Sequence, residues 1–416
     1  MTRAKTLGWL IALGAGALAS ASAQQAAVVA IEAGKVLTMN DDDRVINDAV
    51  VLVEAGKIKA IGKRGEVEIP PGAQVIDARD RWLMPGLIDC HDHIAGSLSD
   101  LNDGVYLTNP GLRTVDTLTP NNELLKNARS GGVTTVMLIP GSGNNMSGFG
   151  TIARTAGDSV KEMTVRAPGS LKIAQAGNPE RYWFGVGRSY MNWNLGQTLA
   201  KARAYHDAWT AWEAAKARGE ELAPPARNLV WEDFRPLFRG EIPVTVHTQA
   251  YQVVQKTITQ LHDTFGLRVV LDHSTFDGYR TSALVVERDL YTIVGPRQFY
   301  FDRTQRRIFS CAQRYFENGV RRLGFNTDAP VLPQEELSLQ ATIGCRLGFD
   351  PYLALKGLTI YPARALLIDD LVGSIEVGKA ADFGLWTGDP LDPRHACLMT
   401  IVQGKVVYDA SKDRRF

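Results

Sequence analysis

The stretch LMPGLIDCHDHI, residues 83–94, carries the strongest structural signal in this 416-residue chain. Its apolar residues predict a buried strand, and Pro85 and Gly86 mark the point where the chain enters it. His91 and His93 follow at a spacing of two, which places both side chains on the same side of an extended strand. Two such imidazoles can bind one divalent metal ion, but the pair alone is equally well explained as a polar strand end.

The composition is that of an ordinary globular protein, with 45% hydrophobic residues, 22% charged residues and a formal net charge of +1. Its length suits one large domain or two moderate ones. The near-neutral charge gives no reason to expect nucleic acid or an anionic membrane surface as a partner. The four cysteines are too few and too scattered for a disulfide framework.

The N-terminus has the features of a secretory signal peptide. Arg3 and Lys5 precede an apolar run at residues 7–18, and an A-x-A box follows at residues 21–23. This order predicts export and removal of residues 1–23. The alternative, a membrane anchor, is disfavoured because the apolar run is too short to span a bilayer. We therefore expect a periplasmic or secreted protein that has no membrane anchor after cleavage.

Short β-like runs separated by turns occupy both ends of the mature chain. In residues 27–83 such runs alternate with glycine-containing turns, and residues 367–416 show the same alternation. We expect the two ends to form one small β-sandwich, with residues 84–366 inserted between them as the catalytic domain. Two unrelated β caps are the alternative.

Between these ends, apolar runs alternate with helical stretches, which predicts parallel βα units. Beyond the strand in the opening stretch, six more can be recognised, at residues 133–140, 171–175, 244–248, 267–274, 291–296 and 323–328. An eighth strand is expected between residues 151 and 165. Eight such units predict an α/β fold with a (β/α)8 TIM-like barrel, whose chemistry lies at the C-terminal ends of its strands.

Side chains that can bind metal stand near the ends of several predicted strands. They are His91, His93, Lys172, His247, His273 and Asp328. A single histidine in a strand is more often a core residue than a ligand. Four histidines and an aspartate at the same end of successive strands instead indicate a metal centre.

These motifs resemble those of the metal-dependent amidohydrolase superfamily, and most closely its imidazolonepropionase-like branch. The similarity covers nearly the whole mature chain. The segments that carry it are PGLIDCHDH (85–93), GGVTTVMLIPGSGNN (131–145), EIPVTVHTQ (241–249), LDHSTFDG (271–278), NTDAP (326–330) and VGSIEVGKAADFGLWTGDP (372–390). The resemblance implies a barrel hydrolase with a flanking β-sandwich, in which metal-activated water attacks the carbonyl of a C–N bond.

The resemblance also implies roles for the strand-end residues. It makes metal ligands or close neighbours of His91, His93, His247, His273 and Asp328. Asp328 would also be the general base. Lys172 matches a position that some branches carboxylate with carbon dioxide, and the resulting carbamate bridges two metal ions. Without carboxylation, one ion is expected, and His273 would orient water or substrate. Zinc is the first choice, and manganese or cobalt would also fit.

The chain departs from familiar relatives at three positions. Gln249 stands where many have a second histidine, Gly177 where many have a glutamate, and Ala329 where many have a histidine. The missing carboxylate at Gly177 shifts the bridging role towards Lys172. The other two changes are expected to alter the substrate pocket.

The expected substrate is a small amide, such as a dipeptide, an N-acyl amino acid or a cyclic amide. Arginines near the active face could hold a substrate carboxylate while aromatic side chains pack against the substrate, although ordinary surface roles explain them equally well. The substrate-binding candidates are Arg181, Tyr182, Tyr190, Gln249 and Arg297. The sequence does not reveal the oligomeric state.

Two other functions compete with amide hydrolysis. One is a deaminase on the same scaffold, which is disfavoured because Thr248 and Gln249 stand where a proton-donating glutamate is usual. The other is a catalytically inactive barrel that only binds its ligand. The complete set of metal-binding side chains argues against that loss.

Overall fold

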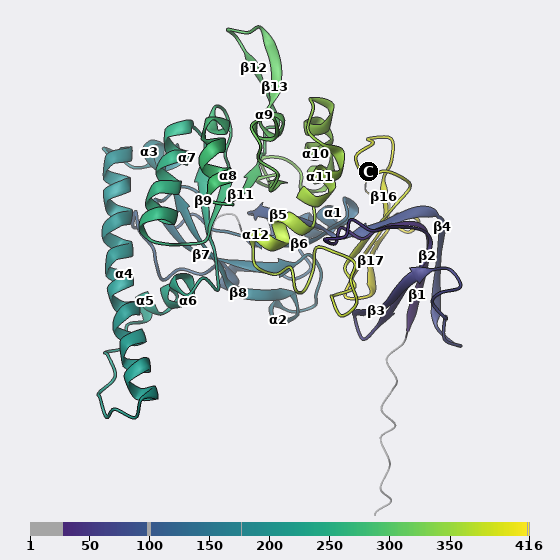
Figure 1. Cartoon of the computed structure of the whole chain (residues 1–416), viewed down its shortest axis with the longest axis horizontal. Helices are drawn as coiled ribbons and strands as arrows, with labels where there is room; N and C mark the ends of the chain where they lie inside the picture. The colour runs from purple at the N-terminus through teal and green to yellow at the C-terminus, as the bar shows by residue number, and fades with distance from the viewer. Residues whose placement is uncertain (1–27, 98–100, 176, 414, 416) are drawn as a thin grey trace, which may run out of the picture.

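The computed structural model describes residues 28–97, 101–175, 177–413 and 415 (Figure 1). Two large sheets dominate it, one of eight strands and one of seven. The predicted signal peptide lies outside the described residues, so export stays a prediction.

Strands from both ends of the chain form the seven-stranded sheet. In sheet order they are β17 (Lys405–Asp409), β16 (Cys397–Val402), β15 (Phe383–Trp386), β4 (Gln74–Pro85), β1 (Val29–Leu37), β2 (Val45–Glu54) and β3 (Lys57–Lys63). β1 and β4 are parallel, and the other pairs are antiparallel. Apolar side chains from both ends, including Val36, Val51 and Phe383, share one core. The ends therefore build a single β module and not two separate caps.

The eight-stranded sheet forms a nearly closed barrel. In sheet order its strands are β5 (Leu87–Asp92), β6 (Val133–Leu138), β7 (Met146–Arg154), β8 (Thr164–Ala174), β9 (Val244–Thr248), β10 (Val269–His273), β11 (Tyr291–Val294) and β14 (Leu323–Phe325). The amide of His93 donates to the carbonyl of Ala329 at 3.0 Å, which joins the first strand to the end of the last. The seven strands recognised in the sequence are all confirmed.

The eighth strand, β7, lies earlier in the chain than predicted. Only residues 151–154 fall in the predicted range, and most of the remainder forms a loop and the short helix α2 (Val160–Met163). β7 runs antiparallel to both β6 and β8. The expectation of eight parallel βα units is therefore wrong here, because the short link between β6 and β7 cannot contain a crossover helix.

Helices surround the barrel, and α4 lies along its flank (Figure 1). The remaining helices are α1 (Glu123–Ser130), α3 (Asn178–Tyr182), α4 (Arg188–Ala217), α5 (Leu229–Glu232), α6 (Phe234–Phe238), α7 (Tyr251–Thr257), α8 (Ser282–Glu287), α9 (Cys311–Glu317), α10 (Leu337–Arg346), α11 (Pro351–Gly357) and α12 (Ile360–Ala365). Shorter 3₁₀ turns are η2 (Thr114–Thr117), η4 (Gly278–Thr281) and η5 (Gln334–Glu336), and η3 (Ile258–Thr264) is a π-helix. A hairpin of β12 (Phe299–Asp302) and β13 (Arg307–Ser310) projects from the barrel.

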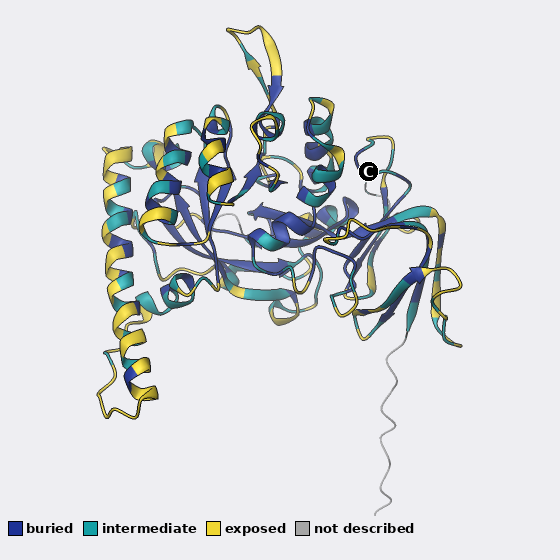
Figure 2. Ribbon diagram, viewed as in Figure 1, coloured by how far each residue is buried: buried dark blue, intermediate teal, exposed yellow. Residues whose placement is uncertain are grey.

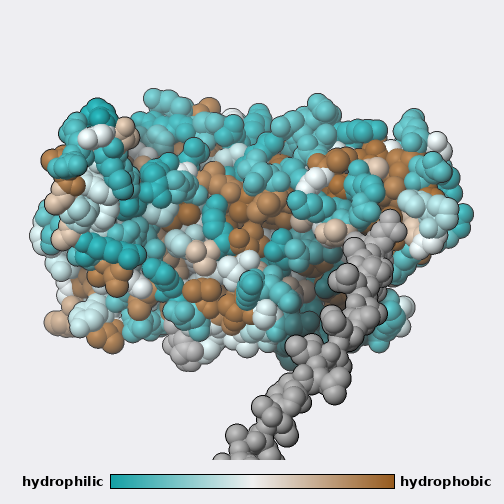
Figure 3. All heavy atoms as spheres, turned by 90° about the horizontal axis from the view of Figure 1, so that it is seen from below, coloured by the Kyte–Doolittle hydropathy of each residue, from teal (hydrophilic) through white to brown (hydrophobic). Residues whose placement is uncertain are grey.

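The barrel strands are buried, whereas the outer sides of the helices are exposed (Figure 2). On the face seen in Figure 3, hydrophobic side chains lie in patches between hydrophilic ones. Among the described residues, no helix combines the length and the apolar character needed to cross a bilayer.

Candidate metal centre

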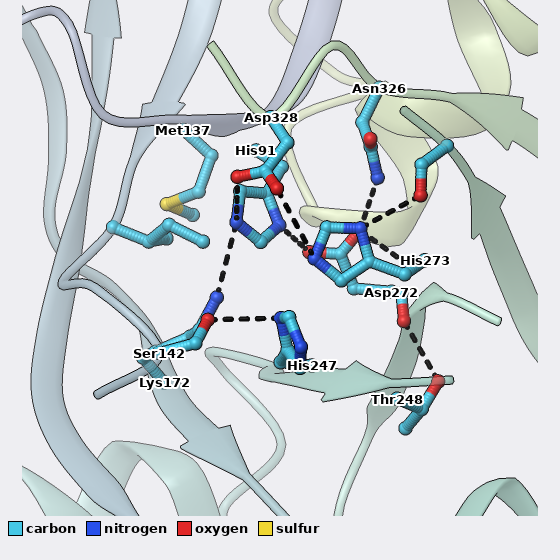
Figure 4. A network of polar contacts seen from close by, with 12 residues as sticks. His91, Met137, Ser142, Lys172, His247, Thr248, Asp272, His273, Asn326 and Asp328 are labelled. Atoms are coloured by element: carbon cyan, nitrogen blue, oxygen red, sulfur yellow. Dashed lines mark hydrogen bonds and ion pairs between the residues drawn. The ribbon is translucent and has the colours of Figure 1, made fainter. Parts of the chain in front are cut away.

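The predicted metal ligands meet at one end of the barrel (Figure 4). His91 Nε2 lies 3.0 Å from His93 Nε2 and 3.1 Å from Asp328 Oδ1. The distance from His93 Nε2 to Asp328 Oδ1 is 3.3 Å. Lys172 Nζ lies 3.3 Å from His91 Nε2. Strands far apart in the sequence thus bring these four side chains within contact distance.

His247 and His273 complete the cluster. Their ring centroids are 4.4 Å apart, and His273 lies equally close to the ring of His91. His273 Nε2 lies 4.0 Å from Asp328 Oδ2. His247 Nδ1 faces the hydroxyl of Ser142 at 3.0 Å. All six predicted residues therefore converge on one centre.

Hydrogen bonds to Nδ1 orient three of the imidazoles. His91 Nδ1 contacts the carboxylate of Asp272, while His93 and His273 each donate from Nδ1 to a backbone carbonyl at 2.9 Å. A proton on Nδ1 leaves a lone pair on Nε2, which is the arrangement found in histidines that ligate metals. His273 Nε2 is buried without a hydrogen-bond partner in the described part of the chain. The donor set fits a divalent metal ion.

Ligand atoms lie within 4.8 Å of one another in two overlapping groups. One group contains His91, His93 and Asp328, and the other contains His91, Asp272 and His273. Imidazole and carboxylate donors in this number suit zinc and similar ions.

The cluster keeps most of these side chains in the form that binds metal. Burial, reinforced by neighbouring positive groups, lowers the pKa of His273 to about 4 and that of His247 well below its usual value. Burial opposes ionisation of Asp328, but His91 and His93 hold its pKa far below the usual range. At neutral pH the imidazoles of His247 and His273 are therefore neutral and the Asp328 carboxylate is ionised, as metal binding requires.

His91 differs from the other histidines. Burial lowers its pKa, but the charges of Asp272 and Asp328 and the hydrogen bond to Asp272 together outweigh this effect and raise the pKa to about 9. The site thus favours a positive charge at His91. A bound metal ion would supply that charge in place of the proton.

Asp272 is a functional residue that the sequence analysis missed. It is fully buried and accepts hydrogen bonds from Asn326 Nδ2 at 2.7 Å and from the amide of His273 at 3.0 Å. The signal was present, because a carboxylate inside a buried strand requires a partner. Ser142, at the carboxyl side of β6, was missed as well.

A cavity of about 700 Å³ opens onto the centre and reaches His93, His247 and Asp328. Of the predicted substrate-binding residues, Tyr182 lines it, and Gln249 Nε2 lies 3.4 Å from His247 Nε2.

The other predicted substrate-binding residues lie elsewhere in the structure. Arg181 is exposed, Tyr190 packs against Trp193 with ring centroids 5.7 Å apart, and the guanidinium of Arg297 lies 5.3 Å from the ring centre of Tyr300. None of the three belongs to the described residues that line the cavity. Their roles in binding substrate stay predictions.

Comparison with known proteins finds similarity to amidohydrolases. The profile of the amidohydrolase family matches residues 312–410. The imidazolonepropionase of Pseudomonas entomophila (strain L48) is 28% identical over 376 residues, which cover 82% of this chain and 88% of that protein. The crystal structure of an amidohydrolase from Thermotoga maritima MSB8 aligns with a TM-score of 0.77 and 26% identity over 92% of this chain and 100% of the other. The chain is thus similar to amidohydrolases over most of its length, and its residues 312–410 match the family profile.

Another amidohydrolase relative is much longer. Amidohydrolase tasK of Hapsidospora irregularis is 24% identical over 86% of this chain, but this chain spans only 40% of that protein. The resemblance drawn from the motifs is confirmed, and the protein is a hydrolase acting on carbon–nitrogen bonds.

Proposed function

We propose that this amidohydrolase is an exported, zinc-dependent enzyme that hydrolyses the amide bond of a small molecule. The observation that carries the proposal is the convergence of three oriented imidazole Nε2 atoms and the Asp328 carboxylate beside one cavity. Export is supported by the basic start, the apolar run and the A-x-A box at the N-terminus.

Asp328 is placed to act as the general base. Bound at this centre, a divalent ion would supply an acidified water and polarise the scissile carbonyl. Asp328 borders the cavity and is ionised, so it can accept the proton of the attacking water and return it to the leaving nitrogen. His91, His93, His247 and Asp328 would hold the ion, and His273 would be a further ligand or would orient the substrate.

We also propose that Lys172 is carboxylated. Its side chain is fully buried, and burial lowers the pKa of its ammonium to about 8. Within the described residues, no carboxylate hydrogen-bonds to Nζ, whereas His91 Nε2 lies 3.3 Å away. The neutral amine would attack carbon dioxide, form an N–C bond and release one proton. The resulting carbamate would replace a group that repels a metal ion by one that bridges two.

Elemental analysis and activity measurements test these assignments together. The protein purified without chelator should hold about two metal ions per chain if Lys172 is carboxylated and about one if it is not. Its mass under native conditions should exceed the sequence mass by one carbon dioxide in the first case.

Asp328→Asn should retain much of the metal but reduce kcat by about a hundredfold or more, because the base is lost. Asp80→Asn, on the exposed part of β4, is the matched control and should behave as the wild type. Retained activity in Asp328→Asn would contradict the base assignment. Absence of tight metal after reconstitution with zinc and bicarbonate would contradict the hydrolase mechanism.

A further inference from the structure

The cavity above the metal centre has an uncharged polar wall. Beyond the metal-binding side chains, its lining includes Asn102, Ser142, Asn144 and Asn178. None of the residues that line it in the described chain is a lysine or an arginine.

Two arginines of neighbouring segments, Arg188 and Arg297, contact residues that do not line the cavity. Arg188 Nε forms an ion pair with Glu180 Oε1 at 3.2 Å, and the same glutamate accepts the amide of Gly177 at 2.9 Å. Arg297 lies over Tyr300, and Arg181 is exposed. A substrate carboxylate in this cavity would therefore lack a cationic partner in the wall, and an unpaired charge in a partly enclosed site is costly.

Hydrogen-bonding groups for a neutral ligand are present instead. The side chains of Asn102 and Asn178 line the cavity, and neither has a hydrogen-bond partner in the part of the chain that the structure describes. Each amide offers both donors and an acceptor. They can therefore satisfy an uncharged amide or carbonyl without leaving a charge unpaired.

Trp183 supplies a fixed flat surface beside these amides. Its indole Nε1 donates to the carbonyl of Gly143 at 3.0 Å and contacts Asn144 Oδ1 at 3.2 Å. Asn144 is held in turn by the backbone carbonyl of Asp103. A ring anchored at its polar edge leaves its apolar face free to pack against a planar or apolar part of the substrate.

We propose that the substrates of this enzyme are uncharged amides, such as cyclic amides or N-acyl amines, that carry no carboxylate beside the scissile bond. The inference rests on the proposed hydrolysis and adds the substrate class. Free dipeptides, N-acyl amino acids and imidazolonepropionate all carry a carboxylate and are expected to be poor substrates.

Matched substrate pairs test this class on the metal-loaded protein. The pairs are N-acetylphenethylamine with N-acetylphenylalanine, hydantoin with hydantoin-5-acetate, and the primary amide of imidazolonepropionate with imidazolonepropionate itself. In each pair that is hydrolysed, kcat/KM of the neutral member should be higher by about tenfold or more. Preference for the carboxylates would overturn the inference and leave the proposed hydrolysis intact. Failure to hydrolyse any pair would overturn both.

Two variants at one position separate charge from size. Asn178→Arg places a cation in the wall, and Asn178→Met adds comparable length without charge. Relative to Asn178→Met, Asn178→Arg should raise the ratio of carboxylate to neutral kcat/KM by about tenfold. An unchanged ratio in a folded, metal-loaded Asn178→Arg protein would show that wall charge does not set the preference and would overturn the inference.

Discussion

Gln334 connects the two strand ends that carry the predicted metal ligands His91, His93 and Asp328. Its side-chain Nε2 donates to Asp89 Oδ2 at 3.3 Å and to Asp92 Oδ1 at 3.2 Å. Asp89 also accepts hydrogen bonds from the amide and the hydroxyl of Thr327, the residue before Asp328. Asp92 stands between His91 and His93 at the end of β5, and all four residues of this network are buried. Gln334 is therefore a positioning residue for the centre.

Replacing Gln334 by methionine should disturb both stability and catalysis. Gln334→Met keeps the length of the side chain but removes both donors, which leaves two buried carboxylates less well satisfied. We expect a loss of about 1–3 kcal/mol in the free energy of unfolding. Misplacement of the ligands should lower kcat by about tenfold with little change in KM. Urea unfolding and steady-state kinetics measure the two effects.

Gln340→Met is the matched control for Gln334→Met. Gln340 is also buried, on α10, but it makes no hydrogen bond to the metal centre among the described residues. The substitution Gln340→Met should therefore leave kcat unchanged. If Gln334→Met loses stability but keeps the wild-type kcat, the network is structural only and does not position the ligands.

The clustering of the candidate ligands could be predicted from the sequence because these residues stand near the ends of successive strands. The partners of the orienting groups could not be predicted, since only the folded barrel brings Asp272 to His91 and Ser142 to His247. A sequence shows that His91 and His93 share a side of a strand. It does not show that the carboxylate beside His91 comes from a strand that begins 178 residues after it, at Val269.

At the scale of elements, β7 shows why a strand can be missed when strands are predicted from the sequence pattern. All but its last residue are buried, so it has no alternation of apolar and polar positions. A Cβ on Gly148 would lie 2.6 Å from the carbonyl oxygen of Leu112, and one on Gly150 would lie 2.9 Å from that of Leu138. Close backbone packing requires these glycines, which also lower the strand propensity. The parallel strands were recognisable because they are apolar and β-branched.

The contact between the barrel and the β module contains a buried carboxylate, Asp382. Its Oδ1 accepts the amide of Gln403 at 2.6 Å, and its Oδ2 lies 3.8 Å from Arg154 Nε in β7. Burial raises the pKa of Asp382, although Arg154 opposes the shift. The folded state therefore binds the Asp382 proton more tightly than the unfolded state does. Protonated Asp382 stabilises the fold at acidic pH, and this stabilisation is lost as the pH rises above about 4.

Asp382→Asn should therefore become relatively more stable as the pH rises. The amide keeps an acceptor for Gln403 and has no proton to lose, so the difference in unfolding free energy, variant minus wild type, should increase between about pH 4 and pH 7. Denaturant unfolding over this range measures it. Asp409→Asn is a control of opposite sign, because hydrogen bonds from Ser411 lower the pKa of Asp409. If the difference in unfolding free energy between Asp382→Asn and the wild type does not change with pH, burial of the Asp382 charge costs no stability.

At the scale of the whole molecule, the candidate metal centre joins strands that are far apart in the sequence. The predicted ligands come from β5, β8, β9 and β10 and from the end of β14, which together run almost around the barrel. The polar atoms gathered there, including the unpartnered Nε2 of His273, oppose folding unless something binds them. A ligand that binds only the folded barrel should therefore stabilise the whole molecule.

Removal of metal should accordingly lower the thermal stability of the protein. Zinc at about a hundredfold excess over its Kd should add about 2.7 kcal/mol to the free energy of unfolding, and Tm should rise by several degrees. Thermal unfolding of chelator-treated protein with and without zinc measures the shift. Calcium is the control, because it prefers oxygen ligands and should bind this imidazole-rich site poorly. Equal shifts with zinc and calcium would indicate surface binding, whereas a shift with zinc alone that His273→Ala diminishes would place the ion among these strands.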